Sequence, residues 1–278
     1  CMVHNPGYDF NDALLLTGAA LGAAGLLLQT VIRNPLGEPH ILGLNAGATL
    51  AVVVCSAAGI TVGVSRPLAA ALGAAALFGL VMMLASAGRA GATAMKITLC
   101  GVALSAFASA ITASILILDE QTLQAMRTWL AGDLSGISLT TLQIASIPTL
   151  LGILLAGILA PRLNILALGD RVASGLGVSV ARTRVLGVIA IALLCGAAVS
   201  VAGPIGFIGL VVPHVIRRWA GQDIRTGLLL ALPTGALLLL SADILARWLL
   251  VPQELATGVM TAMVGAPVFI AIAVRFFK

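Results

Sequence analysis

Few side chains in this sequence could do chemistry, and the most conspicuous pair lies in the segment SADILARWLL. Asp243 and Arg247 are four residues apart, about one helical turn, so they can form an ion pair on one helix face. Charged groups inside apolar segments are costly to bury and usually have a purpose. Because the pair lies toward one end of its apolar run, we expect a structural or docking role at a rim. The alternative is the coupling carboxylate of an ion-driven carrier.

The other reactive residue types do not assemble into a site. His4, His40 and His214 are scattered, with no HExxH motif and no carboxylate at ligand spacing, and for His214 we expect a packing or helix-bending role. Neither Lys96 nor Lys278 follows a GxxxxGK[ST] loop, so this chain has no Walker site for a nucleotide. A GxSxG nucleophile elbow is also missing. We therefore expect no catalytic residue, no metal ligand and no cofactor, and predict that the chain is not an enzyme.

The composition indicates a membrane protein. Hydrophobic residues make up 60% of the 278 residues and charged residues only 9%, with a mean hydropathy of +1.13, whereas about 25% of the residues of soluble domains are charged. Cys55, Cys100 and Cys195 lie in apolar runs, far from each other and from Cys1, so neither a disulfide framework nor a CxxC motif is present. The net charge of +5 fits arginines in cytoplasmic loops better than nucleic-acid binding, which we do not expect.

Apolar runs of near 20 residues recur along the chain, and each is long enough to cross a bilayer as a helix. The apolar runs are continuous rather than alternating, which disfavours a β-barrel. We predict an all-α, polytopic membrane helical bundle, a single transmembrane domain over residues 1–278. The nine expected spans are 12–31, 41–59, 67–87, 96–118, 141–159, 185–203, 205–219, 227–248 and 258–274.

The alternate loops differ in charge, which predicts the orientation. One set of loops carries twelve of the fifteen basic residues, and the other carries three basic residues with seven of the ten acids. By the positive-inside rule the first set is cytoplasmic. Its residues are Arg33, Arg89, Lys96, Arg162, Arg171, Arg182, Arg184, Arg217, Arg218, Arg225, Arg275 and Lys278. The second set contains Arg66, Arg127, Arg247, Asp9, Asp12, Asp119, Glu120, Asp133, Asp243 and Glu254.

With nine spans and a cytoplasmic C-terminus, residue 1 lies outside, and we expect at least one further helix upstream of this sequence. The span 205–219 is the least certain of the nine, because about 13 residues precede its arginines and Pro213 removes a backbone donor from its middle. Such broken segments persist at membrane depth when protein or a wet cavity shields them. The span is therefore either close to a transport path or a kinked helix packed inside the bundle.

Seven segments together resemble a known family, the permeases of type II ABC importers (the FecCD and vitamin B12 type), which import vitamin B12, ferric siderophores and haem. The likeness runs in order over essentially the whole chain and is closest to the ferric siderophore permeases. The segments are GAALGAAGLLLQTVIRNPLGEPHILGLNAGA (18–48), CGVALSA (100–106), WLAGDLSG (129–136), LALGDRVASGLGVSVARTR (166–184), GPIGFIGLVVPHVIRRWAGQDIR (203–225), ADILAR (242–247) and ELATGVMTAMVGAPVF (254–269).

The resemblance implies a fold of ten transmembrane helices with both ends inside, of which the first is absent here. It implies a multi-pass permease subunit of the bacterial inner membrane that translocates an iron–siderophore complex. Its expected partners are ATP-binding cassette ATPase subunits, a second permease chain (identical or paralogous), a periplasmic or lipoprotein binding protein, and membrane lipid. Haem or vitamin B12 import is the alternative by the same mechanism, and an ion-coupled secondary transporter is the alternative of a different class.

The resemblance also implies site residues. In the loop RNPLGEP, Asn34 and Leu36 match positions that narrow the cytoplasmic end of the pathway, although a plain tight turn is an alternative. The loop 89–96 matches a second gating region only weakly. Arg247 matches a position that faces the binding protein, and the local pair with Asp243 is its alternative. At the segment GYDFND the family's usual arginines are absent, so we assign no docking role there.

The cytoplasmic segment 162–184 matches the element that couples the family's permeases to their ATPases. Val172, Leu176 and Val180 follow a spacing of four residues and could form an apolar docking stripe, and Gly175 and Gly177 would break the segment into two short helices. Arg171, Arg182 and Arg184 could pair with partner acids or lipid phosphates. The coupling residues implied are Gly169, Asp170, Arg171, Ala173, Leu176, Gly177 and Arg182.

Overall fold

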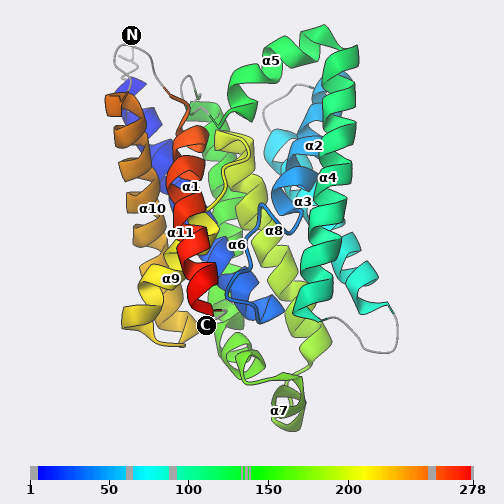
Figure 1. Cartoon of the computed structure of the whole chain (residues 1–278), viewed down its shortest axis with the longest axis vertical. Coiled ribbons are helices and arrows are strands. Elements are labelled where there is room, and N and C mark those ends of the chain that lie inside the picture. Colours follow the sequence, from blue (N-terminus) through cyan, green and yellow to red (C-terminus); the bar gives the residue numbers. More distant parts are fainter. Residues whose placement is uncertain are drawn as a thin grey trace.

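In the computed structural model of the chain, residues 6–60, 65–87, 93–132, 134, 137, 139–249 and 255–276 are described, and every regular element in this part is an α-helix. The all-α prediction is confirmed (Figure 1). The helices are α1 (Pro6–Ile32), α2 (Leu44–Ala57), α3 (Ser65–Ser86), α4 (Ala94–Leu118), α5 (Glu120–Leu130), α6 (Leu139–Ala167), α7 (Asp170–Gly175), α8 (Val180–Ala202), α9 (Ile208–Ala220), α10 (Ile224–Leu249) and α11 (Thr257–Phe276).

Each of the nine expected spans coincides with a helix, and the helices α5 and α7 are additional. Six helices (α1, α3, α4, α6, α8 and α10) are long and apolar enough to cross a bilayer, whereas α2 and the apolar part of α11, Thr257–Ile270, are shorter. Helix α9 has 13 residues with Pro213 inside it, as the sequence predicted. Helix α6 continues past Pro161 to Ala167, beyond the expected end at 159.

Helices α1 and α8 form the centre of the bundle. In their apolar windows 83% and 72% of the residues are buried, against 22% for α4, whose large apolar side chains are mostly exposed. Helix α1 packs against α6, α8, α9 and α10. A Cβ atom added at Gly18 would overlap the backbone of Gly235 in α10, so small residues bring these two helices into backbone contact. The core is therefore built on close helix approach, as is usual in lipid.

The bundle has two distinct ends. Figure 1 shows α5 at the end of the bundle where α1 begins, next to α2 and α4, and α7 at the opposite end, toward which α11 runs. The loop after α1, the α7 segment and the turn between α9 and α10 carry residues of the basic set, so the positive-inside rule predicts that the α7 end is cytoplasmic.

Helix α5 is an amphipathic helix at the outer end that the sequence analysis did not predict. Asp119 caps its first turn, accepting hydrogen bonds from the Thr122 backbone N–H at 3.2 Å and from its hydroxyl at 2.6 Å. These bonds lower the pKa of Asp119. Trp129 is buried and lies under the guanidinium of Arg66, 5.6 Å from its ring centre. A capping Asp three residues before Thr122 was the sequence signal for this helix.

Candidate cytoplasmic gate and coupling site

The expected coupling segment 162–184 contains the end of α6, the short helix α7 and the start of α8, and two glycines with positive φ angles flank α7. Gly169 has φ +118° and Gly177 has φ +77°, conformations that favour glycine. Within the segment Ala173 is buried, while Val172 and Leu176 are exposed by 47% and 62%. The helix ends at Gly175, where the sequence predicted a break, and Val180 opens α8 and packs against the core, so it lies apart from the other two residues of the possible docking stripe. The exposed apolar surface therefore consists of Val172 and Leu176.

Asp170, the first residue of α7, forms ion pairs with two arginines, one in α8 and one directly after α1. The Arg184 Nη2 atom of α8 donates to both carboxylate oxygens at 2.9 and 3.0 Å, and Arg33 Nη1 lies 3.5 Å from Oδ1. Arg33 directly follows α1 and has a φ of +54°, which is uncommon for a residue other than glycine. The carboxylate thus joins the coupling segment to α8 and to the start of the loop 33–43. Arg171 and Arg182 are exposed, and within the described residues neither forms an ion pair.

Asn34 and Leu36, the expected gate residues, lie half-buried in the first turn of the loop 33–43. The Asn34 carboxamide oxygen accepts the backbone N–H of Leu36 at 3.0 Å, and the Asn34 carbonyl accepts that of Gly37 at 3.0 Å. This arrangement is an Asx turn, in which an asparagine side chain replaces a backbone hydrogen-bond partner. Asn34 therefore sets the shape of the turn that presents Leu36.

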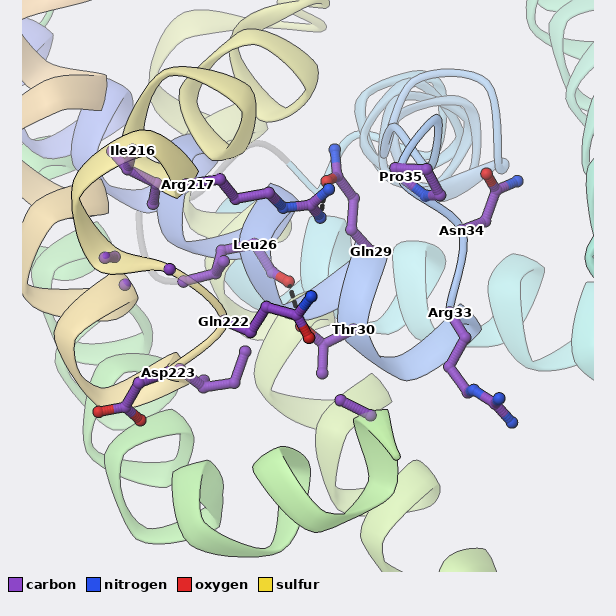
Figure 2. A pocket seen from close by; sticks show the side chains of 15 residues that line it. Leu26, Gln29, Thr30, Arg33, Asn34, Pro35, Ile216, Arg217, Gln222 and Asp223 are labelled. Atoms are coloured by element: carbon purple, nitrogen blue, oxygen red, sulfur yellow. Dashed lines mark hydrogen bonds between the residues drawn. The ribbon is translucent and has the colours of Figure 1, made fainter. Parts of the chain in front are cut away.

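A cavity of about 350 Å³ opens at the cytoplasmic end, between the end of α1, the end of α9 and the start of α10. Figure 2 shows Arg217 pointing toward Gln29 and Gln222 toward Thr30, while Arg33 points away from them. The lining of the cavity includes Asn34 and Pro35, in the first turn of the loop 33–43.

At the edge of this cavity Asp223 joins two helices. It accepts a hydrogen bond from Asn164 of α6 at 2.7 Å, and the Asn164 carbonyl oxygen of the side chain accepts the Ile224 N–H of α10 at 2.8 Å. The bond from Asn164, followed by the Arg225 backbone N–H, lowers the pKa of Asp223. The carboxylate is therefore charged near neutral pH and caps α10.

Polar contacts tie the loop 33–43 to α9 and to the non-helical segment before it. The Glu38 carboxylate accepts the backbone N–H of Phe207 at 2.9 Å, and the Asn45 carboxamide donates to the Ile205 carbonyl at 2.8 Å. Arg217 Nη2 donates to Gln29 Oε1 at 2.6 Å, and Gln29 Nε2 donates to the Gly37 carbonyl at 3.2 Å. None of these contacts was predicted from the sequence, in which Arg217 belongs to the basic set and Gln29 and Asn45 are sparse polar residues of the spans.

At the outer end, Arg247 and Asp243 form the predicted ion pair, with Nε to Oδ2 at 2.8 Å. Asp243 is buried and also accepts the Thr257 hydroxyl of α11 at 2.7 Å. The Arg247 guanidinium lies 4.4 Å from the ring centre of Phe10 in α1. The arginine thus joins α1 and α10 and remains 40% exposed.

Within the residues that the structure describes, no group of three or more His, Cys, Asp or Glu side chains could hold a metal ion. Cys55, Cys100 and Cys195 are free thiols. Cys1, His4 and residues 89–92 of the loop 89–96 lie outside the described residues. His214 contacts the carbonyl of Leu210 one turn earlier at 3.3 Å, in keeping with the packing role expected of it.

Comparison with known proteins places this architecture. The model of the FecCD transport family matches residues 13–275. The chain is 42% identical to the ferric enterobactin transport system permease protein of Escherichia coli over 92% of this chain and 77% of that protein. It is 40% identical to the Fe(3+) dicitrate permease protein FecC of the same organism (92% and 78%) and 38% identical to a siderophore transport system permease of Bacillus subtilis (95% and 79%).

Two solved structures share the fold. One is an inward-facing ABC transporter assigned to the metal-chelate type, with a TM-score of 0.85 and 27% identity over 99% of this chain and 89% of that chain. The other is PsaBC from Streptococcus pneumoniae in complex with Fab, with a TM-score of 0.69 and 13% identity over 95% and 89%.

Proposed function

This chain belongs to the FecCD transport family, and on that premise we propose that it is the permease subunit of an ATP-driven importer that carries a ferric siderophore across the membrane. It is a multi-pass protein of the inner membrane. The observation that carries the proposal is the 38–42% identity, over more than nine-tenths of the chain, to permeases named for ferric enterobactin, Fe(3+) dicitrate and siderophores.

The substrate follows from these relatives and not from a binding site. No described residue cluster could hold iron, so the complex would be recognised as a whole, and its metal would remain in the chelator. Haem and vitamin B12 are the competing substrates. The test is uptake of labelled ferric siderophore by the reconstituted transporter in competition with haem and cobalamin. If haem or cobalamin alone displaces the label, the assignment of a ferric siderophore as the substrate is wrong.

The coupling proposal rests on α7. This chain has no nucleotide-binding loop, so partner subunits must bind the ATP. The movement of these subunits as they close on ATP must then reach the permease through a protein–protein contact. ATP can shift the permease only through a difference in its affinity for two states. Val172 and Leu176 supply an exposed apolar surface, and Asp170 links it through Arg33 to the gate loop. Gly169, Arg171, Ala173, Gly177 and Arg182 shape or flank this contact.

The remaining parts of the proposal concern the assembly. Two permease chains would enclose the pathway between them, with lipid around the other exposed apolar faces. At the end opposite α7, the exposed part of the Arg247 side chain would contact an acidic residue of the binding protein. Its Nε atom would keep its hydrogen bond to Asp243. Asn34 and Leu36 would narrow the cytoplasmic end of the path.

The substitution Leu176→Glu tests the coupling. It places a charge in the proposed apolar contact, and we expect ATP-driven uptake and substrate-stimulated ATPase activity to fall at least about tenfold, as for loss of a central interface contact. Leu176→Met is the matched control and should stay near wild type because it keeps the apolar surface. Gly177→Trp should act like Leu176→Glu, because its φ of +77° is strained for other residues. Binding-protein docking should remain intact, and unchanged uptake would refute the assignment.

A transporter of a different class gives the opposite inhibitor pattern. An ion-coupled carrier would keep its uptake in vanadate and after ATP depletion, and would lose it with a protonophore. An ATP-driven importer stops with vanadate and ATP depletion. Uptake measured under the three treatments separates the two mechanisms.

A further inference from the structure

Helix α9 and the segment before it are attached to the loop 33–43 and its flanking helices by four side chains, three from residues 29–45 and one from the last turn of α9. These four side chains, Gln29, Glu38, Asn45 and Arg217, are called the polar clasp below. Helix α9 has 13 residues and follows a non-helical segment, so it is a half-helix that does not span the membrane by itself.

The first attachment is at the start of α9. Phe207 precedes the helix with φ +69° and no side chain of its own segment caps the helix. Its backbone N–H instead donates to Glu38 Oε1, and Glu38 Oε2 accepts the N–H of Ile41 at 3.3 Å, so one carboxylate joins both segments. Glu38 is 3% exposed, and a buried carboxylate needs such partners. Asn45 holds the same segment through Ile205.

The second attachment is at the end of α9. Arg217 in the last turn reaches Gln29 of α1, and the other end of the Gln29 carboxamide holds the Gly37 carbonyl. Gln29 is 2% exposed, and both polar atoms of its carboxamide have hydrogen-bond partners within the protein. Between the two attachments, a Cβ atom added at Gly209 would lie 2.9 Å from Pro39, which brings the first turn of α9 against the loop.

We infer that Glu38 and Gln29 are positioning residues of the cytoplasmic gate: they fasten the loop 33–43 to both ends of α9, so that a displacement of this half-helix moves Leu36. The inference rests on the proposed function, in which the loop is the gate. It adds α9 as the element that carries the gate and assigns a role to two side chains that touch neither substrate nor ATPase.

The test compares two single cysteines in the assembled transporter, in a background in which the native cysteines are replaced by serine. Leu36→Cys reports on the gate and Arg218→Cys, on the exposed end of α9, reports on the half-helix. The rate of reaction with a small maleimide is measured without nucleotide and after trapping with ATP and vanadate. We expect both positions to change rate at least about threefold between the states, as for a population shift.

In Glu38→Ala and Gln29→Ala, the cysteine at 36 should lose this state dependence while the cysteine at 218 keeps it, and uptake should fall. Glu38→Gln retains an oxygen acceptor for the Phe207 N–H and should keep part of the dependence at 36. Glu120→Ala, which removes an exposed acid from α5, is the control and should change nothing.

Each result has a defined meaning. State dependence that survives at 36 in both alanine variants would overturn the inference, and so would its loss at both positions, because the clasp would then only support the whole bundle. If the cysteine at 36 shows no state dependence in the otherwise wild-type protein, the proposed gate itself is wrong and the inference falls with it.

Discussion

The Asp170 carboxylate pairs with Arg184 of α8 and with Arg33 directly after α1, and this places one residue between the proposed coupling segment and the loop 33–43. The three side chains are 27–45% exposed. Ion pairs at such exposure contribute little to stability, typically about 0–1 kcal/mol. The value of the arrangement is therefore geometric: it fixes how the start of α7 sits on the end of α1.

We predict that Asp170→Asn leaves stability nearly unchanged and lowers transport. The free energy of unfolding should change by about 1 kcal/mol or less, whereas ATP-driven uptake should fall severalfold because Arg33 and Arg184 lose their shared anion. Thermal unfolding in detergent and vesicle uptake measure the two effects. Arg225→Ala, a surface arginine on the same side, is the control. A large loss of stability together with normal specific uptake would contradict this prediction.

Arg247 has two proposed roles, the ion pair with Asp243 and docking of the binding protein, and single substitutions can distinguish them. Among the side chains of the described residues, removing Arg247 leaves the buried Asp243 carboxylate with the Thr257 hydroxyl as its hydrogen-bond partner. Arg247→Ala should therefore destabilise the protein by about 1–3 kcal/mol, and Thr257→Val by about 1 kcal/mol. If Arg247 also docks the binding protein, Arg247→Ala should weaken binding-protein affinity and Thr257→Val should not. Equal affinities in the two variants would leave the local ion pair as the whole role of Arg247.

At the scale of the element, α9 depends on glycines that let its backbone approach α1. A Cβ atom added at Gly25 would overlap the backbone of Gly209, so the two helices touch through their main chains. Such contact is available only to the smallest residues. The half-helix is held in place by shape as well as by the polar clasp.

Gly25→Ala should therefore be costly, whereas another Gly→Ala change in a helix should not. We expect a loss of about 1–3 kcal/mol or more at Gly25, the usual cost of overpacking, and lower uptake because α9 is displaced. Gly157 of α6 has nothing within 4 Å of an added Cβ, so Gly157→Ala is the matched control and should stay within about 1 kcal/mol of wild type. Midpoints of thermal unfolding give both values, and equal losses would refute the contact.

The same elements show what could be predicted from the sequence. All nine expected spans became helices because span length and apolar continuity are local properties of the chain. Helix α5 was missed because it is short and amphipathic and its apolar residues, such as Trp129, belong to no long run.

The contacts of the polar clasp could not be predicted from the sequence either. Glu38 and Phe207 are 169 residues apart, and Gln29 and Arg217 are 188 apart. No spacing rule joins such positions in a single sequence. Asp170 was expected in the coupling segment from resemblance, but its pairing with Arg33 required the fold.

At the scale of the whole molecule, the charge distribution and the fold agree on one orientation. Within the described part of the chain, the α7 end carries Arg33, Arg184 and Arg217, whereas the α5 end carries Asp119 and Glu120, with arginines that are far apart in sequence. Juxtamembrane arginines favour the cytoplasmic side because they are retained there during insertion and meet anionic lipid. An inverted protein would place the proposed ATPase contact where no ATP is available.

We predict that cysteines at the two ends of the bundle are labelled from opposite sides of the membrane. Leu176→Cys in the exposed part of the coupling segment and Gln121→Cys in α5 are exposed positions of similar type. With a membrane-impermeant maleimide, the cysteine at 121 should react in intact spheroplasts and the one at 176 only in inside-out vesicles. Reaction of both after permeabilisation is the control for folding and access. Labelling of 176 from the outside would reverse the topology, and the coupling and gate proposals would fail together, because both require the α7 end to face the ATPase.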